Sequence, residues 1–194
     1  LLLADDESFT IKTLKEYRKI MSDCIGQHNG RVVDSPGDNL LAEFSSAVDA
    51  VQCAVEIQKK LKKENERLVE DKRLNFRIGV NIGDIVQDGD RIYGSGVNVA
   101  ARIEGIADPG GVCVSRSAYD QVKEKLDFTF EYVGEHEAKN IKEPVRVYKV
   151  LMDSESPKPL VDEPLGIPEK PSIAVLPFVN MSGEPGQEYF SDGL

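Results

Sequence analysis

The sequence predicts an α+β domain, because helical and strand patterns alternate along residues 1–152 in the order α-β-β-α-β-β-α-β-α-β-β. Apolar residues recur at steps of three and four in the helical segments and form short runs in the strand segments. Sheets of the βαββαβ type begin with a strand, whereas the first pattern here is a helix. We therefore expect a ferredoxin-like, βαββαβ-type antiparallel sheet with helices on one face, C-terminal αββ additions, and a missing first strand.

Local signals justify each element in turn. Four turn-forming residues, Ser35 to Asp38, lie between two short apolar runs and predict a hairpin. Ser45 or Ser46 can cap the helix that follows, because a hydroxyl oxygen there accepts a hydrogen bond from the first helical turn. The expected helices cover 11–25, 48–61, 97–106 and 118–126. Six of the seven strands in this order have clear ranges, which are 31–33, 39–44, 76–82, 112–114, 128–133 and 145–151.

Composition excludes several classes of protein. The 194 residues hold 24 Lys and Arg against 34 Asp and Glu, a net charge of −10 that disfavours a broad nucleic-acid surface. No apolar run approaches the roughly 18 residues that a membrane span needs. Three scattered cysteines, without the spacing of a zinc site or a disulfide framework, indicate reduced core thiols in the cytoplasm.

The C-terminal quarter differs from the rest. Five of the ten prolines fall between 157 and 171, which predicts an extended acidic linker over 153–170. The run Ser172 to Leu176 is typical of a buried strand. We expect three parts: a domain over 1–152, the linker, and the beginning of a second domain over 171–194.

A few residues could carry chemistry. Asp38 follows Gly37 at the predicted hairpin tip, where an exposed carboxylate suits a hard cation such as Mg²⁺, although Asp is also common in turns. Asn98 and Arg102 are four residues apart and share one helix face, so they could bind ribose and phosphate oxygens. The alternative for this pair is an ordinary solvated face.

Other polar residues give weaker signals. Gly94-Ser95-Gly96 precedes a predicted helix and could bring backbone N–H groups near a phosphate, but it is no P-loop. His28 and His136 have no ligand-like neighbours in the sequence, and we expect both at the surface.

Together the motifs are more specific than any one of them. Residues 1–152 resemble the class III adenylate/guanylate cyclase catalytic domain, through GRVVDSPGDNLLAEF (30–44), FRIGVNIGD (76–84), IYGSGVNVAARIE (92–104), Pro109-Gly110-Gly111, and Lys139-Asn140-Ile141 followed by Pro144-Val145 and Tyr148. The tail PSIAVLPFVNMSG (171–183) is similar to the start of the TolB-like segment that follows cyclase domains in some bacterial proteins.

The resemblance implies a fold and a reaction. In that family the ribose 3′-hydroxyl of ATP or GTP attacks the α-phosphate and pyrophosphate leaves, with two Mg²⁺ or Mn²⁺ ions bound at the interface of a homodimer. One subunit supplies the metal ligands, and its partner supplies the Asn and Arg pair. The implied roles are metal binding for Asp38, transition-state stabilisation for Arg102, ribose orientation for Asn98, and substrate binding for Gly37, Asp34, Arg91 and Lys139.

Two departures from the family pattern bear on activity. The family's other metal aspartate lies on the first strand, and Asp5 and Asp6 do not replace it, because acids at a helix start are explained by the helix dipole. Adenylate cyclases have lysine where Asp34 stands, and an acidic or hydroxyl residue where Arg91 stands. A carboxylate at position 34 favours guanine, unless it is a strand-end residue that points away, while most bacterial members use ATP.

Two functions therefore stay open. The first is an active nucleotidyl cyclase in intracellular signal transduction. The second is a catalytically inactive cyclase-homology module that acts in dimerisation or nucleotide-dependent regulation. The Asn98 and Arg102 pair favours the enzyme, and the absent first aspartate favours the module.

Overall fold

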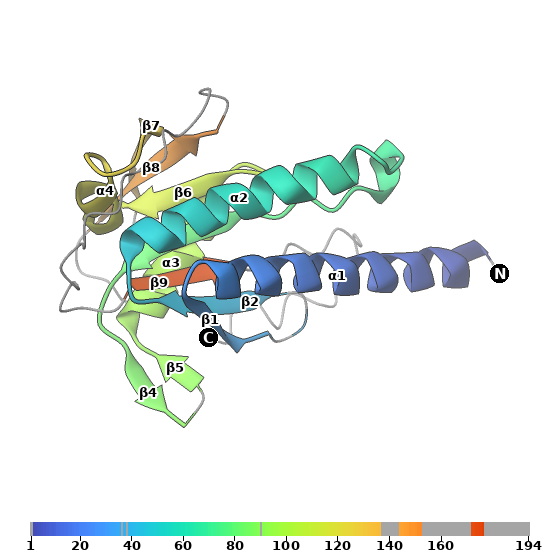
Figure 1. The fold of residues 1–194 in the computed structure, drawn as a ribbon, viewed down its shortest axis with the longest axis horizontal. Helices are drawn as coiled ribbons and strands as arrows, with labels where there is room; N and C mark the ends of the chain where they lie inside the picture. Colours follow the sequence, from blue (N-terminus) through green and yellow to red (C-terminus); the bar gives the residue numbers. More distant parts are fainter. Residues whose placement is uncertain are drawn as a thin grey trace.

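The computed structural model describes residues 2–35, 37, 39–89, 91–136, 144–152 and 172–176 (Figure 1). Its helices are α1 (Leu2–Gln27), α2 (Ala47–Asn65), the short 3-10 helix η1 (Glu70–Lys72), α3 (Ser95–Ile106) and α4 (Arg116–Val122). Its strands are β1 (Gly30–Asp34), β2 (Leu40–Phe44), β3 (Ile78–Ile82), β4 (Val86–Asp88), β5 (Arg91–Tyr93), β6 (Val112–Ser115), β7 (Thr129–His136), β8 (Val145–Leu151) and β9 (Ser172–Leu176). Each helix and strand that the patterns predict is present.

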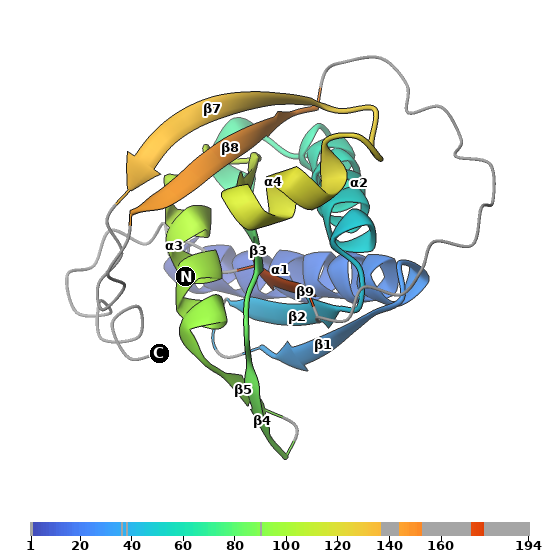
Figure 2. The same ribbon diagram turned by 90° about the vertical axis from the view of Figure 1, so that its left-hand side faces the viewer.

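The main sheet of the described residues has seven strands in the order β1-β2-β9-β3-β6-β8-β7. The expected α+β class is confirmed, with one refinement: β3 and β6 pair in parallel, so the sheet is mixed. A parallel pair needs a crossover, and α3 supplies it between these two strands. The remaining hairpin, β4 with β5, projects from the body of the molecule (Figures 1 and 2).

The helices cover both faces of the sheet, which corrects the expectation of one covered face. Helices α1 and α2 lie side by side on one face, and α3 lies on the opposite side of β3 (Figure 2). Strand alternation explains this arrangement. Ile78 and Val80 point into the main core with α1, α2 and α4, whereas Gly79 between them meets α3. Both faces of β3 are therefore buried, as its continuous burial shows.

Buried polar groups tie α2 to the rest of the core. Gln58 donates two hydrogen bonds of 2.9 Å, to the carbonyl oxygens of Phe76 and Gly111, at the loops before β3 and β6. The Tyr17 hydroxyl donates to Asn65 Oδ1 at 2.8 Å and so joins α1 to the end of α2. Ser46 is the residue that caps α2, accepting from the Asp49 N–H. The core is thus positioned by hydrogen bonds as well as by apolar contact.

Strand β9 occupies the centre of the sheet. It is antiparallel to both neighbours, with Leu40 opposite Leu176 on one side and Gly79 opposite Val175 on the other. The strand predicted over 172–176 is therefore present, and it lies between β2 and β3 in the main sheet. The linker 153–170 lies outside the described residues, and a second domain over 171–194 stays a prediction.

The cysteines behave as core residues. Cys24, Cys53 and Cys113 are free thiols and buried. Burial raises the pKa of Cys53 to about 12 and that of Cys113 to about 11, because a thiolate loses its hydration there. No helix in the described part of the chain is long and apolar enough to cross a membrane.

The close contact between α3 and β3 depends on a glycine. A Cβ atom at Gly79 would overlap the backbone of Ala100 and Glu104, which cannot move without shifting the helix. We expect Gly79→Ala to lower the free energy of unfolding by about 2 kcal/mol or more, as overpacked cores do. Urea unfolding would measure the loss.

Gly26→Ala is the matched control, because a Cβ there meets nothing within 4 Å and the residue lies in helix α1. Alanine favours a helix over glycine by about 1 kcal/mol, so this variant should be as stable as the wild type or more stable. Equal stability of the two variants would show that α3 does not depend on the contact at Gly79.

Candidate functional site

The start of α3 is held against the end of β3. Gly94, with φ of 139°, precedes the helix and accepts backbone hydrogen bonds from the N–H groups of Val97 and Asn98. A Cβ at Gly83 would lie 2.9 Å from Gly96 Cα, so the two backbones are in direct contact. Asn81, 4% exposed, donates from Nδ2 to the Gly96 carbonyl oxygen at 3.0 Å. Glycines here allow the close packing of the two backbones.

This anchoring presents Asn98 and Arg102 together. Both are exposed, one turn apart on the same side of α3, while Ala100 and Ile103 of the same helix are buried. The spacing that the sequence suggested is therefore realised on one accessible face. An amide and a planar guanidinium on that face can bind neutral and anionic oxygens of a ligand.

The β1–β2 hairpin carries two further candidates. Asp34 ends β1 at a register shift after Val32, is half-buried, and accepts a 2.8 Å hydrogen bond at Oδ1 from the Ser35 N–H. Gly37 lies exposed in the turn with φ of 57°, a left-handed conformation that glycine adopts without strain. Asp38, the expected metal ligand, lies outside the described residues.

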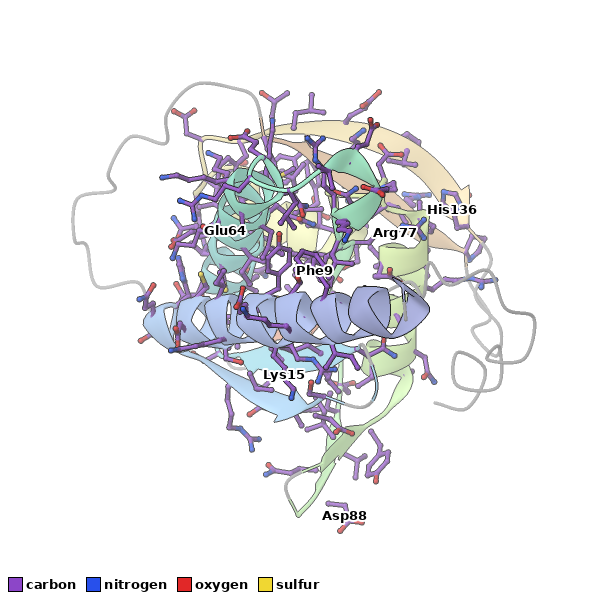
Figure 3. All side chains as sticks on the ribbon, turned by 90° about the vertical axis from the view of Figure 1, so that its right-hand side faces the viewer. Phe9, Lys15, Glu64, Arg77, Asp88 and His136 are labelled. Carbon is purple, nitrogen blue, oxygen red and sulfur yellow. The ribbon has the colours of Figure 1, made fainter. Side chains whose placement is uncertain are left out.

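Arg91 and Lys139 are placed less fully. Arg91 lies in β5 and pairs across the hairpin with Asp88, which Figure 3 shows at the projecting end. Lys139 lies outside the described residues. An apolar cluster joins the base of this hairpin to α3 and to the β1–β2 hairpin; its members are Ile92, Val97 and Ala100, with Val33, Leu41 and Ile85 packed against them. The three elements that carry the candidates therefore meet at one cluster.

The described residues form no metal centre by themselves. Among them, no three His, Cys, Asp or Glu side chains lie close enough to share an ion. Mg²⁺ and Mn²⁺ prefer oxygen ligands such as carboxylates. The family resemblance implies that Asp38 is such a ligand. A complete metal site therefore does not follow from the described side chains.

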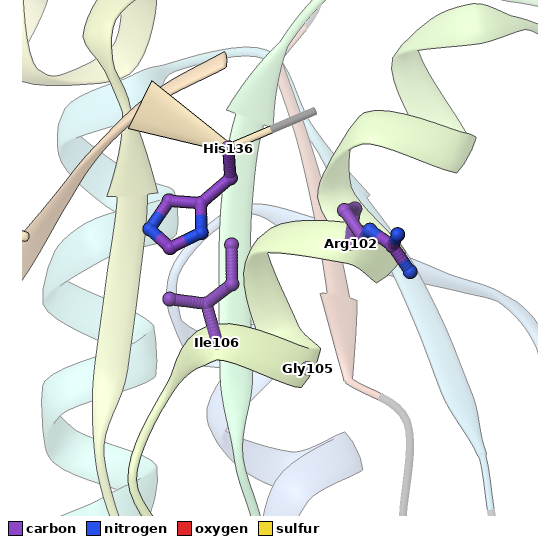
Figure 4. A pocket seen from close by; sticks show the side chains of 4 residues that line it. All are labelled: Arg102, Gly105, Ile106 and His136. Carbon is purple, nitrogen blue, oxygen red and sulfur yellow. The ribbon is translucent and has the colours of Figure 1, made fainter. Parts of the chain in front are cut away.

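A cavity of about 280 Å³ lies between the second half of α3 and the end of β7, lined by Arg102, Gly105, Ile106 and His136 (Figure 4). The expectation that both histidines are surface residues is wrong. His136 is half-buried and its Nε2 is buried with no hydrogen-bond partner. His28 is half-buried too, with Nδ1 3.0 Å from the Cys24 carbonyl oxygen. Alternation along β7, where Phe130, Gly134 and His136 are the less exposed positions, is the signal that could have revealed His136.

Comparison with known proteins identifies the family of this chain. The family model described as adenylate and guanylate cyclase catalytic domain matches residues 3–152. The chain is 42% identical over 197 aligned residues to "Putative adenylate cyclase 3" of Rhizobium meliloti (strain 1021), covering 100% of this chain and 34% of that protein. The chain thus spans about a third of this curated relative.

Solved structures show the same fold. The adenylate/guanylate cyclase/hydrolase from Silicibacter pomeroyi superposes with a TM-score of 0.70 at 38% identity, over 74% of this chain and 86% of that one. The guanylyl cyclase Cya2 superposes with a TM-score of 0.62 at 25% identity, over 74% and 81%. On the match over residues 3–152, this chain belongs to the family of adenylate and guanylate cyclase catalytic domains.

Proposed function

We propose that this chain is the catalytic domain of a nucleotidyl cyclase, which converts a nucleoside triphosphate into a 3′,5′-cyclic nucleotide and pyrophosphate in intracellular signal transduction. One observation carries the proposal beyond family membership: Asn98 and Arg102 stand one turn apart on the exposed face of a helix whose start is fixed to the sheet. Family membership over 3–152 supports the same reaction.

The reaction forms a bond between the ribose O3′ and the α-phosphorus and breaks the bond from that phosphorus to the pyrophosphate. The proton of the 3′-hydroxyl passes to water, and negative charge grows on the phosphoryl oxygens and the leaving group. Arg102 offers a planar set of N–H donors to those oxygens, which matters most in the transition state. Asn98 is proposed to hold the ribose by its amide, so that O3′ faces the phosphorus.

Two Mg²⁺ or Mn²⁺ ions, which the family resemblance implies, would activate the 3′-hydroxyl and bind the triphosphate. Asp38 is the residue of this chain that we propose as a ligand, with Gly37 shaping the turn and Lys139 binding the terminal phosphates. The described residues do not complete such a site, so the roles proposed for Asn98 and Arg102 rest on their own donors and geometry.

We propose that the working unit is a homodimer with its active sites at the interface, as the resemblance implies. The exposure of Asn98 and Arg102 supports this, because both side chains lie at the surface of the described part of the chain. A net charge of −10 gives no support for a nucleic-acid partner. Three buried free thiols favour the cytoplasm, where thiols stay reduced.

We propose ATP as the substrate, in agreement with the name of the Rhizobium meliloti relative and with most bacterial family members. GTP is the alternative that the carboxylate of Asp34 favours, since it can accept from the N1–H and 2-amino groups of guanine. One oxygen of Asp34 already accepts from the Ser35 N–H, which supports the reading as a strand-end residue. Arg91 is the second position proposed to contact the base.

A catalytically inactive module for dimerisation or nucleotide-dependent regulation is the second candidate. One structural observation favours it. Strand β9, at the centre of the sheet, contains Ser, Ile, Ala, Val and Leu and no carboxylate, so this strand brings no metal ligand to the site. Turnover by the wild-type protein separates the two candidates directly.

Arg102→Ala should reduce kcat by about 100- to 1,000-fold with little change in KM, because its contact strengthens as charge develops. Cyclic AMP and cyclic GMP would be measured from ATP and GTP, each with Mg²⁺ and with Mn²⁺. Arg67→Ala is the control, an exposed arginine paired with Glu64 at 2.6 Å. Equal losses in kcat and affinity would remove Arg102 from the transition-state role.

Asp38→Ala should abolish the metal-dependent activity, because the ion loses a carboxylate ligand. Product formation would be titrated against Mn²⁺ concentration in the intact protein. Asp71→Ala serves as the control, since Asp71 is an exposed carboxylate in η1. An unchanged Mn²⁺ dependence in Asp38→Ala would exclude Asp38 from the metal site.

Asp34→Lys should raise the ratio of kcat/KM for ATP over GTP by about tenfold, the scale of one polar contact. Asp34→Asn is the matched variant, because its amide oxygen can still accept from the Ser35 N–H. If Asp34 points away from the base, neither variant will change the ratio measured by competition between the two nucleotides.

A further inference from the structure

The cavity beside Arg102 takes no part in the roles proposed above for Asp38, Asn98 and Arg102. Three of its lining residues, Arg102, Gly105 and Ile106, come from the last turns of α3, and the fourth, His136, comes from the end of β7 (Figure 4). Its volume of about 280 Å³ can hold a group of several heavy atoms. Because Arg102 is proposed to contact the α-phosphate, and Asn98 one turn earlier is proposed to hold the ribose, the pyrophosphate would lie on the side of Arg102 nearer this cavity.

The position of His136 is set by the sheet. It pairs with Val145 at the last register position between β7 and β8, after a register shift at Tyr132 and Gly134. Gly134 has φ of 133°, a conformation that favours glycine, and it allows the shift that turns His136 toward α3. Figure 4 shows the imidazole beside Ile106, with one ring nitrogen turned toward the side where Arg102 lies.

The bonding of the ring is incomplete. Nε2 of His136 is buried and has no hydrogen-bond partner in the described structure. Buried polar atoms in folded proteins nearly always form hydrogen bonds. A buried atom without a partner therefore marks a place where a ligand or a water forms the missing hydrogen bond. Among the described lining residues, therefore, His136 brings hydrogen-bonding capacity that the protein itself does not use.

The side chains that line the cavity are compatible with an anion. Its described lining includes the guanidinium of Arg102 and no carboxylate. Glu135, the nearest acid along β7, accepts at 2.7 Å from Arg146 Nε and is more exposed than His136, so its charge is already paired. Asp108, after the end of α3, is paired with Lys149. A phosphate group entering here would meet donors and no unpaired carboxylate of the described lining.

We propose that His136 is a substrate-contacting residue whose imidazole donates a hydrogen bond to the pyrophosphate part of the nucleotide, beside the α-phosphate contact of Arg102. This inference rests on the proposed cyclase function. The contact involves no covalent step at the histidine. As the bond between the α-phosphorus and the pyrophosphate breaks, charge moves onto the leaving oxygens, and a positioned donor stabilises it.

The test uses inorganic pyrophosphate as the probe on the intact protein, by calorimetric binding and by inhibition of cyclic nucleotide formation. His136→Ala should weaken pyrophosphate binding about tenfold or more, the scale of a hydrogen bond to a charged group. His136→Gln and His136→Asn place an amide donor near Nε2 and near Nδ1, and one of them should bind within about threefold of the wild type. If His136 had only a structural role, neither amide variant would restore pyrophosphate binding.

Glu135→Gln is the matched control, adjacent on the same strand and exposed, and its pyrophosphate affinity should equal that of the wild type. Equal affinity of His136→Ala and the wild type, or equal losses in the Ala, Gln and Asn variants, would overturn the proposal. Wild-type binding of pyrophosphate without cyclic product would overturn the proposed function while the role of His136 stands.

A second measurement does not depend on the folding of variants. Nitrogen-15 NMR of the histidine rings in the wild-type protein should show a shift of the His136 ring nitrogens on adding pyrophosphate. His28, held against the Cys24 carbonyl oxygen and 3.4 Å from Glu56, should stay unchanged and serves as the internal reference. Unshifted His136 signals at saturating pyrophosphate would overturn the proposal.

Discussion

The close packing of α3 on β3 is the constraint on which the candidate site depends. Gly79 leaves space for the backbone of Ala100 and Glu104, and Gly83 meets Gly96 at the start of the helix. Any side chain at these positions would hold the helix away from the sheet. Because the buried side of α3 is fixed in this way, the side that carries Asn98 and Arg102 is fixed as well. The placement of Asn98 and Arg102 thus depends on the absence of side chains at Gly79 and Gly83.

The sheet that supports this contact is buried on both faces and continuous across its centre. Without β9, strands β2 and β3 would each present an unpaired edge, with N–H and C=O groups left to find other partners. Pairing with Ser172–Leu176 satisfies both edges, and α3 packs against β9 as well as against β3. The pairing of β9 therefore supports both the core and the helix that carries Asn98 and Arg102.

The candidate site combines elements that are distant in sequence. The β1–β2 hairpin, the base of the β4–β5 hairpin and α3 meet at one apolar cluster, and β7 brings His136 to the far end of α3. Donors are concentrated along α3, and the carboxylate of Asp34 lies at the end of β1.

The sequence by itself determined the helices, the β1–β2 hairpin, the spacing of Asn98 and Arg102, and the family, because periodicity and motifs are local properties that one stretch of chain carries. Only the tertiary structure decided that α3 covers the opposite face, that β3 and β6 run parallel, and that β9 lies between β2 and β3. It also decided that Nε2 of His136 is buried. Each of these depends on which distant segments pair, and pairing is chosen by the whole core rather than by any local pattern.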